Sequence, residues 1–218
     1  MTVLPETPVV VAMLKAPRPG WVKTRLAAEV GVESATAIYR RLVEHQIAAI
    51  PREWRTEVHF APAEAAADMQ QWLGFPDQLH PQQGDDLGER LVHAAAGAFS
   101  RGAGAVIAIG GDCPGLAEDG LREAARALAS VDVVLGPAAD GGYYLIALRR
   151  ARPELFCDIP WSTAAVLATT LERARAAGLS VALLPIQEDV DDLPSWRRVQ
   201  SLLSRDHVGP APRVDAEP

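Results

Sequence analysis

The chain has 218 residues, with 21 Lys and Arg against 28 Asp and Glu, which gives a formal net charge of −7. Hydrophobic residues make up 49% and charged residues 22%, values that exclude a disordered or fibrous protein. The acidic balance argues against a nucleic-acid partner and against an anionic membrane surface, because both require a basic protein face.

The cysteines and the N-terminal segment bear on the cellular compartment. Cys113 and Cys157 form neither a CxxC pair nor a zinc-ligand spacing, which favours a reducing compartment. The N-terminal segment lacks a positive leader region, and the apolar run 9–14 is too short for a signal sequence or a membrane span. We therefore expect a cytoplasmic protein.

Strand and helix signals alternate along the chain, which is typical of an α/β fold with a mostly parallel sheet. The run VVVAML at 9–14 is typical of a strand buried on both faces, and the turn 140–142 between two strands predicts a hairpin in a mixed sheet. We expect a single domain over 1–204 and a disordered tail over 205–218. In chain order, the predicted strands span 9–14, 56–61, 105–109, 131–135, 143–148 and 181–185, and the predicted helices 33–49, 63–73, 87–100, 118–129, 163–177 and 194–203.

A basic loop follows the first predicted strand. The segment from Lys15 to Arg25 holds four cations and no acid, in a chain that is acidic overall. Ligands of open α/β sheets bind beyond the carboxyl ends of the strands, and Lys and Arg suit a phosphate there. The alternative is a solvated loop that serves solubility. The segment is not a Walker loop, because the chain has no GxxxxGK[ST].

Acidic residues follow two other strands. Asp112 comes just after the predicted strand 105–109, between Gly111 and Cys113, and four acids lie within the segment 188–192 after the last strand. Carboxylates are ligands that Mg²⁺ and Mn²⁺ prefer, so these groups predict a cation facing the basic loop. The alternatives are that Asp112 caps a turn and that the four acids begin the following helix.

Three further segments are candidates for substrate contacts. The loop 83–90 could contact a base or ribose, or cap the helix that follows it. The hydroxyls of Ser162 and Thr163 could bind a substrate, although N-capping is their commoner role. Tyr143 and Tyr144 alternate faces, so we expect one in the core and one at the pocket. The five histidines show no ligand pair at i, i+4, and we expect structural roles for them.

These motifs together resemble the nucleotide-diphospho-sugar transferase superfamily, whose fold is the three-layer, Rossmann-like GT-A type. Within it, the chain is similar to small bacterial transferases linked to radical-SAM and selenodomain proteins, labelled arsenosugar-biosynthesis glycosyltransferases. The resemblance covers about residues 8 to 200. It rests on the segments 15–26, 83–90, 110–114, 140–144, 160–163 and 189–192.

The resemblance implies a nucleotide near Lys23 and Arg25, and a divalent metal, Mg²⁺ or Mn²⁺, held by Asp112 and Asp191. Relatives often carry Asp-x-Asp-Thr where this chain has Asp192 in place of the Thr, which leaves open which acid of 189–192 coordinates. We expect Asp112 and Asp140 to be catalytic. The expected nucleotide-binding residues are Lys15, Pro17, Gly20, Lys23, Thr24, Arg25, Gln83, Gly84 and Gly111, and the expected substrate-binding residues are Gly141, Gly142, Tyr143, Trp161, Ser162 and Thr163.

The function expected from these residues is transfer of a sugar from a nucleotide-diphosphate sugar to a small-molecule acceptor. Two alternatives stay open: a nucleotidyltransferase that releases pyrophosphate from an NTP, and a nucleotide-binding protein without catalysis. The loop 15–25 has one Gly and two Pro, whereas nucleotidyltransferases usually start with a Gly-rich loop, and this favours sugar transfer.

Overall fold

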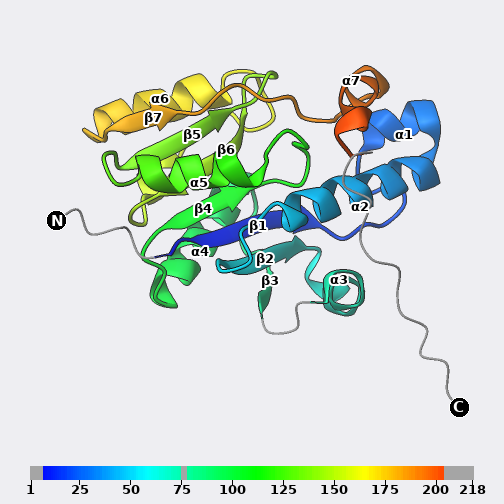
Figure 1. The fold of residues 1–218 in the computed structure, drawn as a ribbon, viewed down its shortest axis with the longest axis horizontal. Coiled ribbons are helices and arrows are strands. Elements are labelled where there is room, and N and C mark those ends of the chain that lie inside the picture. Colours follow the sequence, from blue (N-terminus) through cyan, green and yellow to red (C-terminus); the bar gives the residue numbers. More distant parts are fainter. Residues whose placement is uncertain (1–6, 75–77, 204–218) are drawn as a thin grey trace, which may run out of the picture.

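The computed structural model describes residues 7–74 and 78–203, which form a seven-stranded sheet with helices on both faces. The strands lie in the order β3-β2-β1-β4-β6-β5-β7 (Figure 1). Their bounds are β1 Val9–Lys15, β2 Arg55–Ala61, β3 Leu79–Pro81, β4 Val106–Ile109, β5 Val133–Pro137, β6 Tyr143–Leu148 and β7 Val181–Leu183. The α-helices are α1 Thr24–Val30, α2 Val32–Ala48, α3 Ala66–Leu73, α4 Leu87–Ser100, α5 Glu118–Ala127, α6 Val166–Ala176 and α7 Leu193–Leu203, and two short 3₁₀ helices are η1 Ala63–Ala65 and η3 Pro153–Leu155.

The sheet is mixed, as the turn at 140–142 predicts. Strand β6 is antiparallel to both β4 and β5, and the other neighbouring pairs are parallel. Consequently the carboxyl ends of β1, β4, β5 and β7 and the start of β6 meet at one edge of the sheet, which we call the carboxyl edge. The predicted site segments 15–25, 83–90, 110–114, 140–142 and 188–192 all adjoin a strand at this edge, whereas 160–163 lies between η3 and α6.

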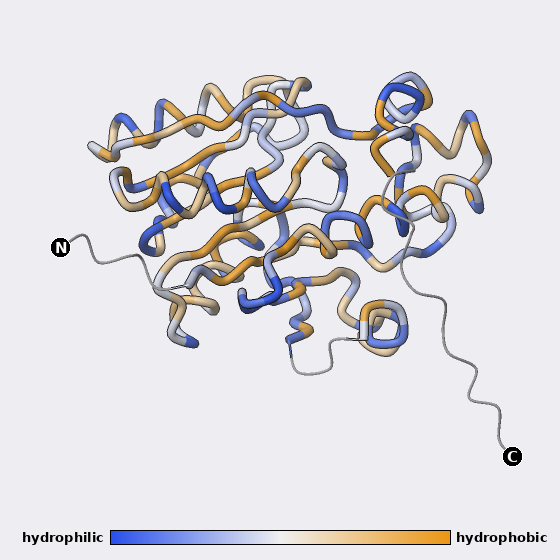
Figure 2. The backbone as a smooth tube through the Cα atoms, viewed as in Figure 1, coloured by the Kyte–Doolittle hydropathy of each residue, from blue (hydrophilic) through white to orange (hydrophobic). Residues whose placement is uncertain are grey.

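Two apolar cores cover the two faces of the sheet. On one face, side chains of β1 and β4 pack against α2, α3 and α5, with Val43, Met69 and Leu121 fully buried. On the other face, Val9 and Val11 pack against α4 and α6. Figure 2 shows the strands as mostly hydrophobic and α5 as largely hydrophilic on the outside. The three-layer α/β prediction is therefore confirmed.

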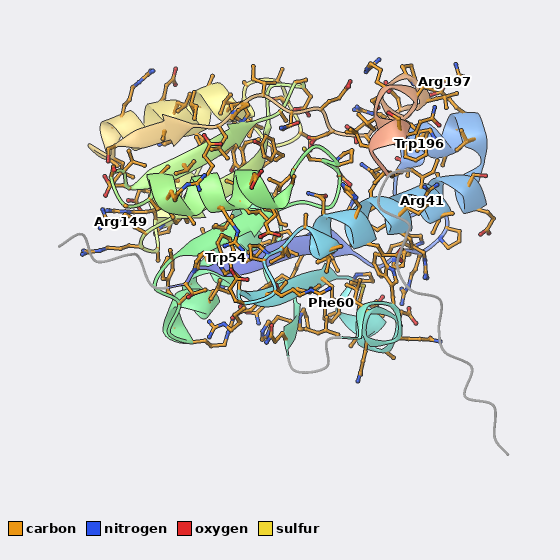
Figure 3. All side chains as sticks on the ribbon, viewed as in Figure 1. Arg41, Trp54, Phe60, Arg149, Trp196 and Arg197 are labelled. Carbon is orange, nitrogen blue, oxygen red and sulfur yellow. The ribbon has the colours of Figure 1, made fainter. Side chains whose placement is uncertain are left out.

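A third cluster extends the fold beyond the carboxyl edge. Leu26 of α1, Leu42 of α2 and Val190 are fully buried against Val199 of α7. Figure 1 shows α1 and α7 together at this end of the molecule, and Trp196, labelled in Figure 3, belongs to α7. This cluster joins the segment after β1 to the segment after β7, so it sets the spacing between the basic loop and the acidic segment.

The structure departs from the predicted elements in a few places. Helix α1 lies in a stretch predicted as loop. It has seven residues and no side-chain cap, so it depends on packing through Leu26 rather than on local propensity. Strand β3 is also new, and its three residues, one of them proline, are too few to show an alternating pattern. Helix α6 begins at Val166 rather than at 163.

The predicted tail 205–218 lies outside the described residues. The assignment of 1–204 to one domain stays a prediction. Across 7–74 and 78–203, the structure contains no helix that is long and apolar enough to cross a bilayer.

Candidate active site

A cavity of about 740 Å³ opens at the carboxyl edge of the sheet. Its wall combines the end of β1, helix α1, the loops after β4 and β7, and the turn between β5 and β6. Of the residues expected from the sequence, the wall includes Lys15, Lys23, Thr24, Arg25, Gly111, Asp112, Asp140, Gly142, Tyr143, Trp161, Ser162, Thr163 and Asp191.

Lys23 joins the basic loop to the acidic residues. Its ammonium lies 2.8 Å from Asp112 Oδ1 and donates a hydrogen bond to Asp191 Oδ1 at 3.3 Å. The Lys23 side chain is only 4% exposed, whereas those of Asp112 and Asp191 are 43% and 48% exposed. The ammonium therefore lies between the two carboxylates that the resemblance assigns to a metal.

The backbone of Lys23 is unusual. Its φ of 48° and ψ of 47° are left-handed, and it is the residue just before α1. A non-glycine residue in this region carries strain that the surrounding structure must offset. Here the side chain gains two carboxylate partners. The geometry directs the Lys23 ammonium into the cavity, toward Asp112 and Asp191.

The other cations of the loop are placed differently. Arg25 is 80% exposed and lies 3.9 Å from Asp191 Oδ2, at the mouth of the cavity. Arg18 turns away, pairs with Glu64 and Asp68, and lies 5.7 Å from the centre of the Trp21 ring. Of the cations expected to contact a phosphate, Lys23 is therefore buried in the cavity and Arg25 is exposed at its mouth.

Asp189 is an acid of the cavity that the sequence could not single out. It is largely buried, and its Oδ1 has no hydrogen-bond partner among the described residues. Burial raises the pKa of Asp189 to about 7, and the carboxylates of Asp112 and Asp140 add to this rise while Lys23 opposes it. A buried carboxyl that lacks a partner, among other carboxylates, is suited to a cation.

The remaining acids of segment 188–192 stabilise the fold. Asp192 Oδ1 accepts a hydrogen bond from Ser195 N at 2.8 Å in the first turn of α7, and hydrogen bonds from Ser195 lower the pKa of Asp192. Glu188 pairs with Arg198. The expectation of a helix-capping role therefore applies to Asp192, and Asp191 and Asp189 are left for the cavity.

Gly111 and Lys15 are fixed by contacts with α2. A Cβ on Gly111 would lie 2.7 Å from Val43 Cγ2 and 2.9 Å from Leu14 Cδ2, so this glycine allows close packing against the core. Its neighbour Gly110, by contrast, has open space where a Cβ would be.

The Tyr39 hydroxyl accepts from Lys15 N and donates to Lys15 O, both at 2.9 Å, which holds the end of β1. Tyr39 also lines the cavity, and no sequence signal pointed to it.

An aromatic wall lies on the other side of the cavity. The rings of Tyr143 and Trp161 meet edge to face, with centroids 6.3 Å apart, and Leu87 and Leu91 of α4 line the same cavity. Tyr144 is also at the cavity, although it is buried and its hydroxyl donates to Pro185 O at 3.1 Å. Tyr144 thus belongs to the core and Tyr143 to the cavity wall, as the alternation of faces predicts, and the turn before β6 also brings Tyr144 to the edge of the cavity.

The turn between β5 and β6 presents Asp140 to the cavity. Asp140 Oδ1 accepts from Gly142 N at 2.8 Å, which holds the carboxylate over the turn.

The segment before α6 forms a turn of its own. Ser162 has a φ of 63°, and the Thr163 hydroxyl donates to Pro160 O at 2.7 Å. The Thr163 hydroxyl is thus used within its own turn while the residue lines the cavity wall.

Five expected site residues do not line the cavity: Pro17, Gly20, Gln83, Gly84 and Gly141. Pro17 is buried beneath the loop, and Gly20 is at its exposed tip with a φ of 81°. Gln83 and Gly84 belong to the segment before α4, where Asp86 caps the helix by accepting from Glu89 N. Gly141 packs against the backbone of Ala164, where any side chain would clash. Their sequence patterns reflect turns and caps.

Comparison with known proteins identifies the family of this chain. Residues 46–163, more than half of the chain, match the family described as an uncharacterized protein conserved in bacteria, DUF2064. The chain belongs to this family. The matched segment includes Asp112, Asp140 and Trp161, and it excludes Lys23 and Asp191. No curated protein matches the sequence significantly.

Solved structures share the fold. A protein from Desulfovibrio desulfuricans G20, provisionally named a nucleotide-diphospho-sugar transferase, is 31% identical, with a TM-score of 0.80 over 91% of this chain and 98% of its own. A CMP:2-keto-3-deoxy-manno-octonic acid synthetase solved with CTP is 14% identical, with a TM-score of 0.57 over 91% and 99%. Rv0371c of Mycobacterium tuberculosis H37Rv, solved with manganese, is 16% identical, with a TM-score of 0.56 over 91% and 100%.

These comparisons confirm the resemblance and the expected enzyme class, a transferase. The two distant structures show the shared fold alone. This chain therefore has the α/β fold of nucleotide-diphospho-sugar transferases, and its site residues occupy the edge of the sheet that binds ligands in open α/β folds.

Proposed function

We propose that the cavity binds a nucleotide-diphosphate sugar and transfers the sugar to a small acceptor that carries a hydroxyl group. The observation that supports this most is the position of the buried Lys23 ammonium among Asp112, Asp189 and Asp191 at the carboxyl edge. A fixed cation beside a carboxylate cluster suits a leaving diphosphate, because negative charge develops there as the sugar leaves.

The carboxylates fit a divalent cation. Asp189 Oδ1 is buried and has no hydrogen-bond partner in the described part of the chain, and four carboxylates line a cavity that holds the cations Lys15, Lys23 and Arg25. Asp112 and Asp191 would hold Mg²⁺ or Mn²⁺, with Asp189 behind them. The cation, when bound, would neutralise charge on the diphosphate.

Four residues of the cavity bind the substrates and accept the proton. Lys23 leaves the carboxylates and binds a diphosphate oxygen, Asp140 receives the proton of the acceptor hydroxyl, and the wall of Tyr143 and Trp161 packs against the sugar or the acceptor. The acceptor oxygen forms a bond to the anomeric carbon as the bond from that carbon to the diphosphate breaks. The products are the glycosylated acceptor, a nucleoside diphosphate and the proton.

The loop after β1 favours sugar transfer over nucleotidyl transfer. Pro17 and Pro19 have no N–H group, and the N–H groups of Ala16, Arg18 and Trp21 donate within the protein, to Ala61 O, Ala16 O and Arg18 O. Among residues 16–21 this leaves the N–H of Gly20 alone to contact a triphosphate. A diphosphate held mainly by Lys23 and a metal needs fewer backbone donors.

Product analysis tests this proposal. The protein is incubated with Mn²⁺ and a panel of nucleotide sugars and NTPs, and released nucleoside diphosphate and pyrophosphate are both measured. We expect slow diphosphate release from a matching nucleotide sugar, because water can act as a poor acceptor, and we expect no pyrophosphate. The Asp112→Asn variant should abolish this release.

Pyrophosphate release that depends on Asp112, without diphosphate from any sugar donor, would contradict sugar transfer and support a nucleotidyltransferase. If neither nucleoside diphosphate nor pyrophosphate is released, and no nucleotide changes the thermal stability, the result would contradict both transferase activities. The cytoplasmic location stays a prediction.

A further inference from the structure

A second cluster of metal-binding side chains lies away from the cavity, on β2 and β3. Glu57 and His59 alternate on β2, and His80 of β3 is directly in register with His59. Glu57 and His59 pair with Val11 and Met13 of β1, which pack in the core under α4 and α6. One donor atom from each of the three residues lies within 4.8 Å of the other two.

Glu57 supplies the carboxylate of the cluster. Its side chain is 2% exposed, and it pairs with Arg101 and lies 3.3 Å from Arg55. Carboxylates and imidazoles bind metals through their deprotonated atoms.

The spacing also suits a metal. His59 Nε2 lies 3.5 Å from Glu57 Oε2, at the limit of a hydrogen bond, and this buried nitrogen has no hydrogen-bond partner among the described residues. Bonds of about 2.0–2.1 Å at a tetrahedral Zn²⁺ place two ligand atoms about 3.4 Å apart. The His59 and His80 rings are 5.0 Å apart between centroids, so His80 can supply a third ligand.

We propose that Glu57, His59 and His80 bind one Zn²⁺ ion that fastens the edge strand β3 to β2. Two imidazoles and one carboxylate favour Zn²⁺ over Mg²⁺, which prefers oxygen ligands. Arg101 Nε donates to Glu57 Oε1 at 3.1 Å and Arg101 also pairs with Oε2, so this guanidinium orients the ligating carboxylate.

The site acts on stability rather than on the reaction. Strand β3 has three residues and, among the described strands, pairs with β2 alone, and none of the three ligands lines the 740 Å³ cavity. The segment after β3 leads to α4, whose Leu87 and Leu91 line that cavity. A bound ion therefore reinforces the strand that precedes one wall of the active site.

Zinc titration of the full chain tests the proposal. Protein treated with a chelator is titrated with Zn²⁺ by calorimetry, and with Co²⁺ while its visible absorption is recorded. The double variant Asp112→Asn, Asp191→Asn removes carboxylates of the cavity, and His93→Ala removes an exposed histidine of α4. We expect one Zn²⁺ per chain in the parent, the double variant and His93→Ala, with an imidazole-dependent Co²⁺ spectrum and a raised melting temperature.

His80→Ala should lower zinc affinity at least 100-fold and abolish the zinc-dependent rise in melting temperature. His80 is only half buried, so this variant should fold, and circular dichroism checks that it does. His59→Gln gives a second measurement with the same expected loss. Zinc binding that persists in both variants, disappears in the double carboxylate variant, or is absent from the parent would overturn the proposal.

Discussion

Lys23→Met should weaken binding of a nucleoside diphosphate by about 1.5–3 kcal/mol, roughly 10- to 150-fold, and at the same time tighten binding of Mn²⁺ alone by roughly tenfold. The two effects have opposite signs because Lys23 plays two roles. In the protein without ligands its ammonium occupies the space between Asp112 and Asp191, 2.8 Å and 3.3 Å from their oxygens. A metal must displace it from there, and the displaced ammonium then binds an oxygen of the diphosphate.

Calorimetric titration of Mn²⁺, and separately of UDP and GDP with Mn²⁺ present, measures both effects. Arg25→Met is the matched control, because Arg25 is 80% exposed and lies 3.9 Å from Asp191. It should change either affinity severalfold at most. If Lys23→Met weakens Mn²⁺ binding, the ammonium holds the carboxylates together rather than competing with the metal, and the exchange described here is wrong.

Asp112→Asn should remove the metal-dependent part of nucleotide binding and lower Mn²⁺ affinity at least ~100-fold. Loss of a residue that merely orients a ligand costs 10- to 100-fold, so loss of a ligand itself should cost no less. The substitution preserves size, and Asp112 is 43% exposed, so the melting temperature of the metal-free variant should change little. Titration with Mn²⁺, and with UDP with and without Mn²⁺, gives the affinities.

Asp192→Asn is the matched control for this variant. Asp192 belongs to the same acidic segment, yet its Oδ1 caps α7 through Ser195 N, and asparagine caps a helix about as well as aspartate. Metal affinity and stability should both stay near the parent values. Equal effects of Asp192→Asn and Asp112→Asn on Mn²⁺ binding would show that only the overall charge of the segment matters.

The layered fold was predictable because its signals are local and strong. The buried strand β1 is an apolar run, and the helix α4 has the predicted bounds Leu87–Ser100 because Asp86 caps it. The position of Asp112 after a buried strand also followed from the pattern alone. Helix α1 could not be predicted in this way, since Leu26 is stabilised by residues from α2 and α7 that are distant in the sequence.

The candidate site was predictable by segment but not by residue. The acids 188–192 look alike in the sequence, and only packing separates Asp189 in the cavity from Asp192 at the start of α7. The cations of the basic loop divide in the same way, because Arg18 finds Glu64 and Asp68 on another segment. His59 and His80 are 21 positions apart, and only the register of β2 with β3 brings them together.

A crystal structure with UDP or GDP and Mn²⁺ tests the central claim most directly, since anomalous scattering locates the manganese independently of the nucleotide. We predict one manganese peak at Asp112 and Asp191, with the Lys23 ammonium moved from the carboxylates onto a diphosphate oxygen, inside the 740 Å³ cavity. A diphosphate bound elsewhere, or one bound in the cavity while Lys23 keeps its pairs with Asp112 and Asp191, would contradict the account.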